Sequence, residues 1–233
     1  MRIRVINPVT KVVLGGEILP PLPDFVQAEL DWVKEGLPSI ECRYDDAVSV
    51  PALLELVKAA ARDRVDGIVI NCFMDPGLKT ARELVHIPVA GPAESAMLLA
   101  SSLGQNFSVI LPAASGAPIV ADEAIAYGVR DNLASVRSVE MAVAELSDHP
   151  RLTRELMVQA EKAMTDDGAH VIILGCTGMC GVTAGVRQEI TNRGYDVPVI
   201  DPTQAAIGLL AALYTMGVHH SGRAYEVPSW RRG

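Results

Sequence analysis

Val65-Asp66-Gly67-Ile68-Val69-Ile70-Asn71-Cys72 is a short apolar run that ends in a cysteine, and the chain repeats this pattern once. The second copy is Ala169-His170-Val171-Ile172-Ile173-Leu174-Gly175-Cys176. Continuous apolar runs of this length are typical of strands that are buried in a parallel sheet. Because each run ends in a thiol, the repeat indicates two matching halves and suggests an acid/base site with two sides.

Other segments repeat in the same order. Arg4-Val5-Ile6-Asn7-Pro8 is similar to Ser108-Val109-Ile110-Leu111-Pro112. Ile87-Pro88-Val89-Ala90-Gly91-Pro92 is similar to Val197-Pro198-Val199-Ile200-Asp201-Pro202. The repeat distance is close to half of the 233 residues, which predicts two fused lobes rather than a solenoid of many short units.

Strands and helices are expected to alternate along the chain. We expect strands at 3–7, 39–44, 67–71, 89–91, 107–111, 135–139, 170–174 and 199–201. We expect helices at 24–34, 50–62, 78–84, 94–103, 120–127, 151–166, 182–193 and 204–216. This order predicts an α/β fold with two pseudo-symmetric lobes, each a mostly parallel sheet flanked by helices. The expected first lobe comprises residues 1–97 and 205–233, and the expected second lobe comprises residues 98–204.

The composition excludes several classes of protein. The net charge is −8, and the only cluster of basic residues is Arg231-Arg232, so the electrostatic footprint of a nucleic-acid-binding protein is missing. No apolar run is long enough to span a bilayer, and the start of the chain does not resemble a signal peptide. The four cysteines are too few for a disulfide framework, so we expect reduced thiols in a cytoplasmic protein.

Cys72 and Cys176 both follow a predicted strand, at the edge where open parallel sheets bind ligands. A thiol has a pKa of about 8.5, which a helix N-terminus lowers. We therefore expect a thiolate to be favoured at both positions. A thiolate and a thiol on opposite faces of a carbon can remove a proton from one side and return one on the other. Backbone N–H groups nearby can stabilise the enolate that forms when the proton leaves. If the substrate carbon is already acidic, the reaction needs no cofactor.

Two motifs in the sequence are specific: Cys72-Phe73-Met74-Asp75-Pro76-Gly77-Leu78 and Leu174-Gly175-Cys176-Thr177-Gly178-Met179. With Ile3-Arg4-Val5-Ile6-Asn7-Pro8, Pro38-Ser39-Ile40-Glu41 and Val50-Pro51-Ala52-Leu53-Leu54-Glu55 in support, the chain resembles the aspartate/glutamate racemase superfamily. Within it, the resemblance is strongest to the hydantoin and allantoin racemases, and it covers nearly the whole chain.

The resemblance implies a cofactor-independent racemase whose substrate lies in the cleft between the two lobes. On this interpretation Cys72 and Cys176 are the acid/base pair, Asn7 touches the substrate, and Phe73 and Thr177 offer it their backbone N–H groups. Ser115 and Asp75 are further candidates for substrate contact. The sequence departs from the family pattern at Met74, at Val9 and in Pro112-Ala113-Ala114-Ser115. We expect these loops to line the pocket and to alter substrate choice.

Simpler interpretations remain for several residues. Asn7 and Asp75 are also typical of turns, and Glu94 and Asp201 of helix N-termini. Cys180 follows Cys176 by one helical turn but is expected to be a packing thiol, and Cys42 a structural one in a strand. The histidines are scattered, so we expect no metal site, and the glycines match no nucleotide-binding pattern.

The sequence therefore predicts a cytoplasmic racemase or epimerase that acts on an acidic C–H beside a carbonyl, most readily a 5-substituted hydantoin or allantoin. We expect a homo-oligomer without nucleic-acid or membrane partners. The alternatives are an arylmalonate decarboxylase-like enzyme, a maleate cis–trans isomerase and, outside the enzymes, a two-lobe sensor of small molecules. Residues 219–233 are expected to form a surface arm or an interface segment.

Overall fold

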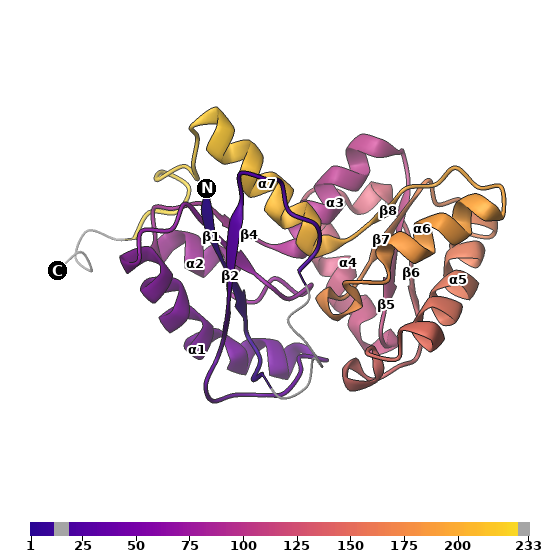
Figure 1. Ribbon diagram of the computed structural model, residues 1–233, viewed down its shortest axis with the longest axis horizontal. Coiled ribbons are helices and arrows are strands. Elements are labelled where there is room, and N and C mark those ends of the chain that lie inside the picture. The colour runs from indigo at the N-terminus through magenta and orange to yellow at the C-terminus, as the bar shows by residue number, and fades with distance from the viewer. Residues whose placement is uncertain (12–18, 228–233) are drawn as a thin grey trace.

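The computed structural model describes residues 1–11 and 19–227. Within these ranges it contains two four-stranded parallel sheets, whose strand orders are β2-β1-β3-β4 and β6-β5-β7-β8 (Figure 1). The first sheet consists of β1 (Arg2–Asn7), β2 (Gln27–Trp32), β3 (Gly67–Ile70) and β4 (Val89–Ala90). The second consists of β5 (Phe107–Leu111), β6 (Leu133–Ser138), β7 (Val171–Leu174) and β8 (Val199–Ile200). Because the two orders are equivalent, the predicted α/β fold with two pseudo-symmetric lobes is confirmed.

Helices cover both faces of each sheet. They are α1 (Arg43–Arg62), α2 (Leu78–Leu84), α3 (Pro92–Leu103), α4 (Ala117–Ala126), α5 (His149–Thr165), α6 (Thr183–Asn192) and α7 (Pro202–Met216). Short 3-10 turns lie at Ala114–Gly116, Arg130–Asn132, Val143–Glu145 and Thr177–Met179. Among the helices of the described ranges, none combines the length and the apolar character that crossing a membrane requires.

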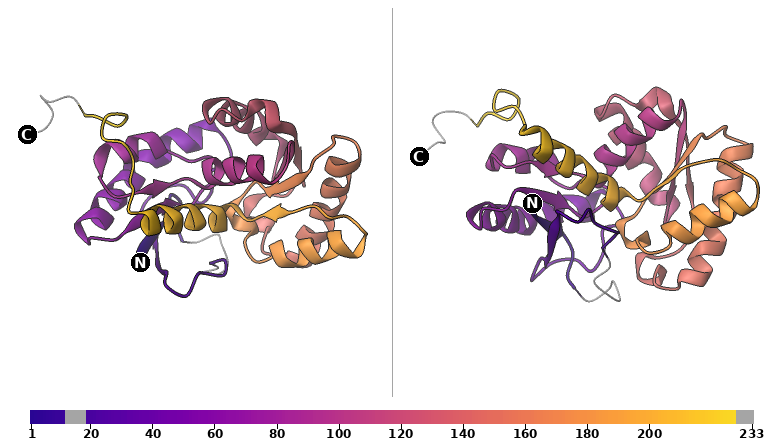
Figure 2. Two further views of the ribbon diagram at one scale, coloured as in Figure 1. Left: turned by 90° about the horizontal axis from the view of Figure 1, so that it is seen from above. Right: turned by 45° about the horizontal axis from the view of Figure 1, so that its top comes forward.

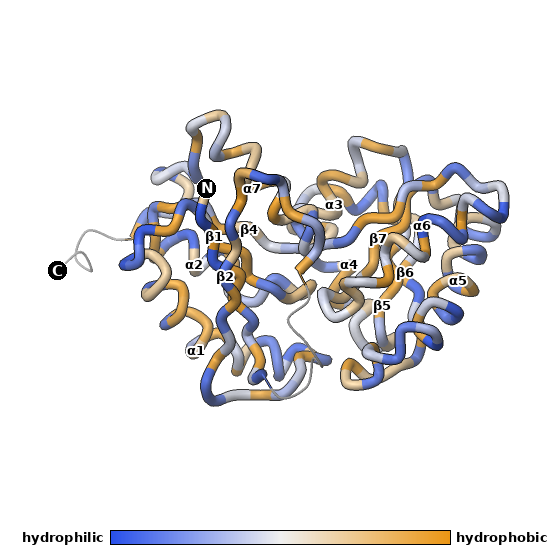
Figure 3. Tube along the Cα trace, in the orientation of Figure 1, coloured by the Kyte–Doolittle hydropathy of each residue, from blue (hydrophilic) through white to orange (hydrophobic). Residues whose placement is uncertain are grey.

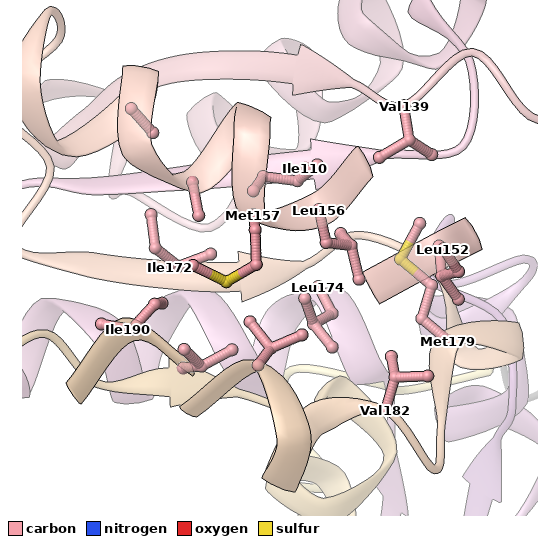
Figure 4. Close-up of a cluster of buried hydrophobic side chains, with 14 of the residues drawn as sticks. Ile110, Val139, Leu152, Leu156, Met157, Ile172, Leu174, Met179, Val182 and Ile190 are labelled. Carbon is pink, nitrogen blue, oxygen red and sulfur yellow. The ribbon is translucent and has the colours of Figure 1, made fainter. Parts of the chain in front are cut away.

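The core follows from the alternation of side chains along each strand. Ile68 and Ile70 pack with α1 and α2 on one face of the first sheet, whereas Val69 packs with α7 on the other. In the second lobe, Ile172 and Leu174 of β7 lie between α5 and α6, as Figure 4 shows. Figure 3 shows the matching pattern of hydropathy, with hydrophobic central strands and hydrophilic stretches along the outer helices.

Two helices are exchanged between the lobes. α3 follows the last strand of the first sheet but packs on the second sheet, with Met97 and Ala100 against Phe107 and Val171. α7 follows the last strand of the second sheet but packs on the first, and Figure 2 shows it running from the second lobe back across the first. The two helices also pack against each other. The expected boundaries, after residue 97 and after residue 204, fall inside α3 and α7, and the division into these two lobes stays a prediction.

Two expected elements are wrong. Residues 24–34 were expected to be helical because Phe25, Ala28 and Trp32 have helical spacing, but Gln27–Trp32 forms the edge strand β2, which pairs in parallel with β1. Pairing with a distant strand overrides the local pattern here.

The expected strand at 39–44 is a loop that leads into α1, which begins at Arg43 instead of residue 50. Asp45 and Asp46 lie in its first turn, where negative charge stabilises the start of a helix. Pro51, expected in the first turn, lies inside the helix.

The chain after α7 folds back onto the first lobe. A ring nitrogen of His220 lies 2.9 Å from the backbone N of Val89, and Arg82 donates a hydrogen bond of 3.2 Å to the Tyr225 hydroxyl. The described part of the tail is therefore a surface arm on the edge strand β4, and residues 228–233 lie outside the described ranges.

Candidate active site

The two cysteines occupy equivalent positions after equivalent strands. The backbone N–H of Asn71 donates to the carbonyl of Ile6, and that of Gly175 donates to the carbonyl of Ile110, both at 2.8 Å. Each pairing prolongs a central strand by one residue, and the chain then turns at the cysteine. Since parallel strands end at the same edge of a sheet, the fold places each thiol at the carboxyl edge of its own sheet.

A cavity of about 80 Å³ lies between these edges, and both lobes line it. The lining residues of the first lobe are Pro8, Val9, Pro38, Ser39, Ile40, Glu41, Asn71, Cys72, Phe73 and Met74. Those of the second are Leu111, Pro112, Ala113, Ser115, Gly116, Val120, Val143, Gly175, Cys176, Thr177 and Gly178. The structure therefore brings together Cys72, Cys176, Phe73, Thr177 and Ser115, and the loops at Val9, Met74 and 112–115 contribute to the lining as expected.

Asn7 lies behind the cavity and is absent from the lining that the described residues form. Its side chain is buried. Asn7 Oδ1 accepts a hydrogen bond of 2.8 Å from Asn71 Nδ2, and Asn7 Nδ2 donates one of 3.1 Å to the carbonyl of Asp31. Asn7 thus supports the residue before Cys72, and its contact with a substrate stays a prediction.

Asp75 is also outside the lining that the described residues form, because its carboxylate begins α3. It accepts hydrogen bonds from the backbone N–H groups of Ala93 (3.0 Å) and Glu94 (2.8 Å) and from the Tyr127 hydroxyl (2.8 Å). Gly91 permits this approach, since a Cβ there would lie 2.4 Å from Asp75 Cγ. The helix-start interpretation therefore describes Asp75 better than substrate contact does.

Two hydrogen bonds join the lobes at residues of the cavity lining. The Thr177 hydroxyl donates to the carbonyl of Asn71 at 3.2 Å. The Ser115 hydroxyl donates to the carbonyl of Glu41 at 3.4 Å. Phe73 is 3% exposed and packs in the core of the second lobe, which anchors the Cys72 turn across the lobe boundary.

Burial dominates the acidity of Cys72. It raises the pKa of the thiol well above its usual value, and the backbone N–H of Met74 opposes this shift. Negative charge on Cys176, Asp75 and Asp46 raises the pKa of Cys72 further. Burial therefore favours the neutral form of this thiol.

Burial likewise raises the pKa of Cys176, to about 11, with a further rise from Glu41 and an opposing effect of the N–H groups of Gly178 and Met179. The expected lowering of both thiol pKa values is thus wrong. The N–H groups are present, but α2 starts only at Leu78 and Thr177–Met179 is a single 3-10 turn. Neither cysteine has the aligned dipoles of a long helix behind it.

The other two cysteines lie apart from this pair. Cys180 is buried beside Asp201, and burial raises the pKa of its thiol to about 12. It does not share a helix face with Cys176, because a 3-10 turn separates the two. Cys42 is exposed at the start of α1, so its expected structural role in a strand is wrong. In the described ranges, no group of three or more His, Cys, Asp or Glu side chains is arranged to hold a metal ion.

Two residues of the site had no assigned role in the sequence. Glu41 is the only charged residue of the lining within the described ranges, and in the sequence its segment serves only as support for the family resemblance. Asn71 precedes Cys72 where the other half has Gly175. This difference between otherwise matching halves is the sequence feature that singles out Asn71.

Comparison with known proteins places this geometry in a family. A family model described as Asp/Glu/Hydantoin racemase matches residues 17–210. A hydantoin racemase from Pseudomonas sp. (strain NS671) is 32% identical over 98% of this chain and 92% of its own. One from Rhizobium meliloti is 36% identical over 77% of this chain and 73% of its own. The structure of an allantoin racemase from Klebsiella pneumoniae superposes with a TM-score of 0.87 at 29% identity, covering 98% of this chain and 94% of the other.

Proposed function

The chain belongs to the Asp/Glu/hydantoin racemase family, and from this premise we propose that it inverts a carbon beside a carbonyl by proton transfer between Cys72 and Cys176. The observation that carries the proposal is the position of the thiols. They follow equivalent strands of two sheets and line one cavity from opposite lobes. Two acid/base groups on opposite sides of one carbon are what inversion without a cofactor requires.

The reaction exchanges roles between the thiols. One cysteine, as the thiolate, takes the proton from the substrate carbon, and the electron pair moves into the adjacent carbonyl to give an enolate. The other cysteine, as the thiol, gives its proton to the opposite face of that carbon and becomes the thiolate. The N–H groups of Met74, Gly178 and Met179 stabilise the charge on sulfur, and we assign those of Phe73 and Thr177 to the substrate oxygens.

The cavity favours a neutral substrate with an apolar substituent. Its walls include Ile40, Met74, Leu111, Val120 and Val143. The carboxylate of Glu41, the only charged lining residue in the described part of the chain, would repel a carboxylate on the substrate. The hydroxyls of Ser39 and Ser115 and the carboxylate of Glu41 also line the cavity and offer partners to a ureido group such as that of allantoin. We therefore propose a 5-substituted hydantoin, allantoin included, as the substrate, in preference to an acidic amino acid.

Proton exchange at the substrate carbon tests the proposal. An enantiopure 5-alkyl hydantoin in D₂O should lose optical rotation and its C5–H signal together, at a rate above that of the enzyme-free solution. Cys72→Ser and Cys176→Ser should each slow inversion by about 10²–10⁴-fold, the usual contribution of a general acid or base. Cys42→Ser, at an exposed position outside the lining, is the matched control and should keep the wild-type rate.

The competing interpretations give different products. A decarboxylase would release CO₂ from an arylmalonate, an isomerase would form fumarate from maleate, and a sensor would bind its ligand without exchange. Inversion at the wild-type rate by the double variant Cys72→Ser, Cys176→Ser would exclude the two-cysteine mechanism.

A further inference from the structure

Asn71 lies where four parts of the molecule meet. Its side-chain Nδ2 donates to Asn7 Oδ1 at the end of β1 (2.8 Å), and its Oδ1 accepts from the hydroxyl of Thr203 in the first turn of α7 (2.8 Å). Its backbone carbonyl accepts from the hydroxyl of Thr177, next to Cys176 (3.2 Å). Its own carbonyl carbon is bonded to the nitrogen of Cys72. One residue therefore joins both cysteine turns to a strand and a helix.

The partners of Asn71 are themselves held in place. Thr203 is 2% exposed and follows Asp201, whose carboxylate accepts from the backbone N–H of Gln204 (2.9 Å) and the hydroxyl of Thr183 (3.2 Å). Asn7 is fixed by its bond to the carbonyl of Asp31. Hydrogen bonds to residues of β1 and α7 therefore fix the side-chain amide of Asn71.

The matching position in the other half has no side chain. Gly175 makes the same backbone hydrogen bond as Asn71, but a Cβ there would lie 2.6 Å from Leu111 Cδ2 and 2.7 Å from Val109 Cγ1. Packing therefore excludes a bridging side chain after β7. The hydrogen bond that joins the two cysteine turns runs from the Thr177 hydroxyl to the backbone carbonyl of Asn71, and the Asn71 side chain fixes that carbonyl from β1 and α7.

We propose that Asn71 is a positioning residue that holds the Cys72 thiol opposite the Cys176 thiol. This inference rests on the proposed two-cysteine function. Inversion needs both sulfurs within reach of one carbon at the same time, and a misplacement of about 1 Å can cost about 100-fold in rate. When the side chain of Asn71 no longer fixes the Cys72 turn, a proton removed by one cysteine is returned to the same face more often than to the opposite face.

The test measures the stereochemical fate of the carbon in D₂O. At early times, the deuterium content of the recovered starting enantiomer reports exchange with retention, and that of the other enantiomer reports inversion. Chiral chromatography with mass spectrometry separates the two. In Asn71→Ala and Thr203→Val, we expect the ratio of retention to inversion to rise at least tenfold, whereas Thr203→Ser, which keeps the hydroxyl, should restore the wild-type ratio.

A matched control separates positioning from general destabilisation. Ser108→Ala removes a buried hydrogen bond of 2.8 Å to Ser135, in the second sheet and outside the cavity lining. It should leave the ratio unchanged. Wild-type ratios in both Asn71→Ala and Thr203→Val would overturn the inference. If Asn71→Ala does not fold, Thr203→Val against Thr203→Ser decides alone. Absence of inversion by the wild type would instead overturn the proposed function.

Discussion

Single side chains set the acidity on which the proposed reaction depends. Burial raises the pKa of both thiols by more than the backbone N–H groups of their turns lower it. A raised pKa leaves little thiolate at neutral pH but makes the thiolate that forms a stronger base. For substrates whose C–H is only weakly acidic, a stronger base is the useful property.

Glu41 offers a test of this balance, because its charge raises the pKa of Cys176. Removing that charge in Glu41→Gln should lower the pKa of Cys176 below its wild-type value of about 11. Alkylation by iodoacetamide depends on the thiolate, so the pH profile of Cys176 labelling should move to lower pH in the variant. Peptide mass spectrometry follows each cysteine separately. Glu189→Gln, on α6 outside the lining, is the control, and an unchanged Cys176 profile in Glu41→Gln would contradict the assignment.

At the scale of elements, the start of α3 depends on a residue from the Cys72 turn. This residue is Asp75, whose carboxylate accepts three hydrogen bonds. Burial raises the pKa of the Asp75 carboxyl to about 7, although the three hydrogen bonds lower it. The same carboxylate therefore links the turn that carries Cys72 to a helix that packs on the other lobe.

Removing this link should be costly. Asp75→Ala leaves two backbone N–H groups and a hydroxyl without their acceptor, and each buried unsatisfied group costs about 1–3 kcal/mol. We expect the free energy of unfolding in urea, followed by circular dichroism, to fall by about 2–4 kcal/mol. Asp148→Ala removes an exposed cap of α5 and should cost only about 1 kcal/mol. Equal losses in the two variants would show that Asp75 is an ordinary helix cap.

The central strands were predictable because both of their faces are buried, which leaves continuous apolar runs. The edge strand β2 was not, since its faces are only partly buried and its pairing is with a distant segment. The cysteines of the site were predictable from the repeat. The roles of Asn7 and Asp75 were not, because the direction of each side chain depends on partners that only the tertiary structure brings near: Asn71 for one and the start of α3 for the other.

At the scale of the whole molecule, the exchange of α3 and α7 makes each lobe depend on the other half of the chain. The first sheet has one face covered by α7, and the second has one covered by α3. In the second sheet α4 shares this face with α3, so each sheet relies in part on a helix from the other half. Cooperative unfolding of the two lobes follows from this arrangement.

Leu210→Ala tests this cooperativity. Leu210 of α7 is fully buried against the first sheet, and truncating a buried leucine costs about 2–5 kcal/mol. Native-state hydrogen exchange should report an equal loss of protection in β3 of the first lobe and β7 of the second. Loss of protection in β3 alone would mean that the lobes unfold independently.

The exchanged helices also constrain how such a chain can have arisen by duplication. The product of a gene for one half would carry a last helix that has no place on its own sheet. Two such products could complete each other by trading that helix, and the cavity would then lie on the twofold axis of a homodimer with identical walls. In a single fused chain the two walls are free to differ, and Asn71 and Gly175 do differ at equivalent positions.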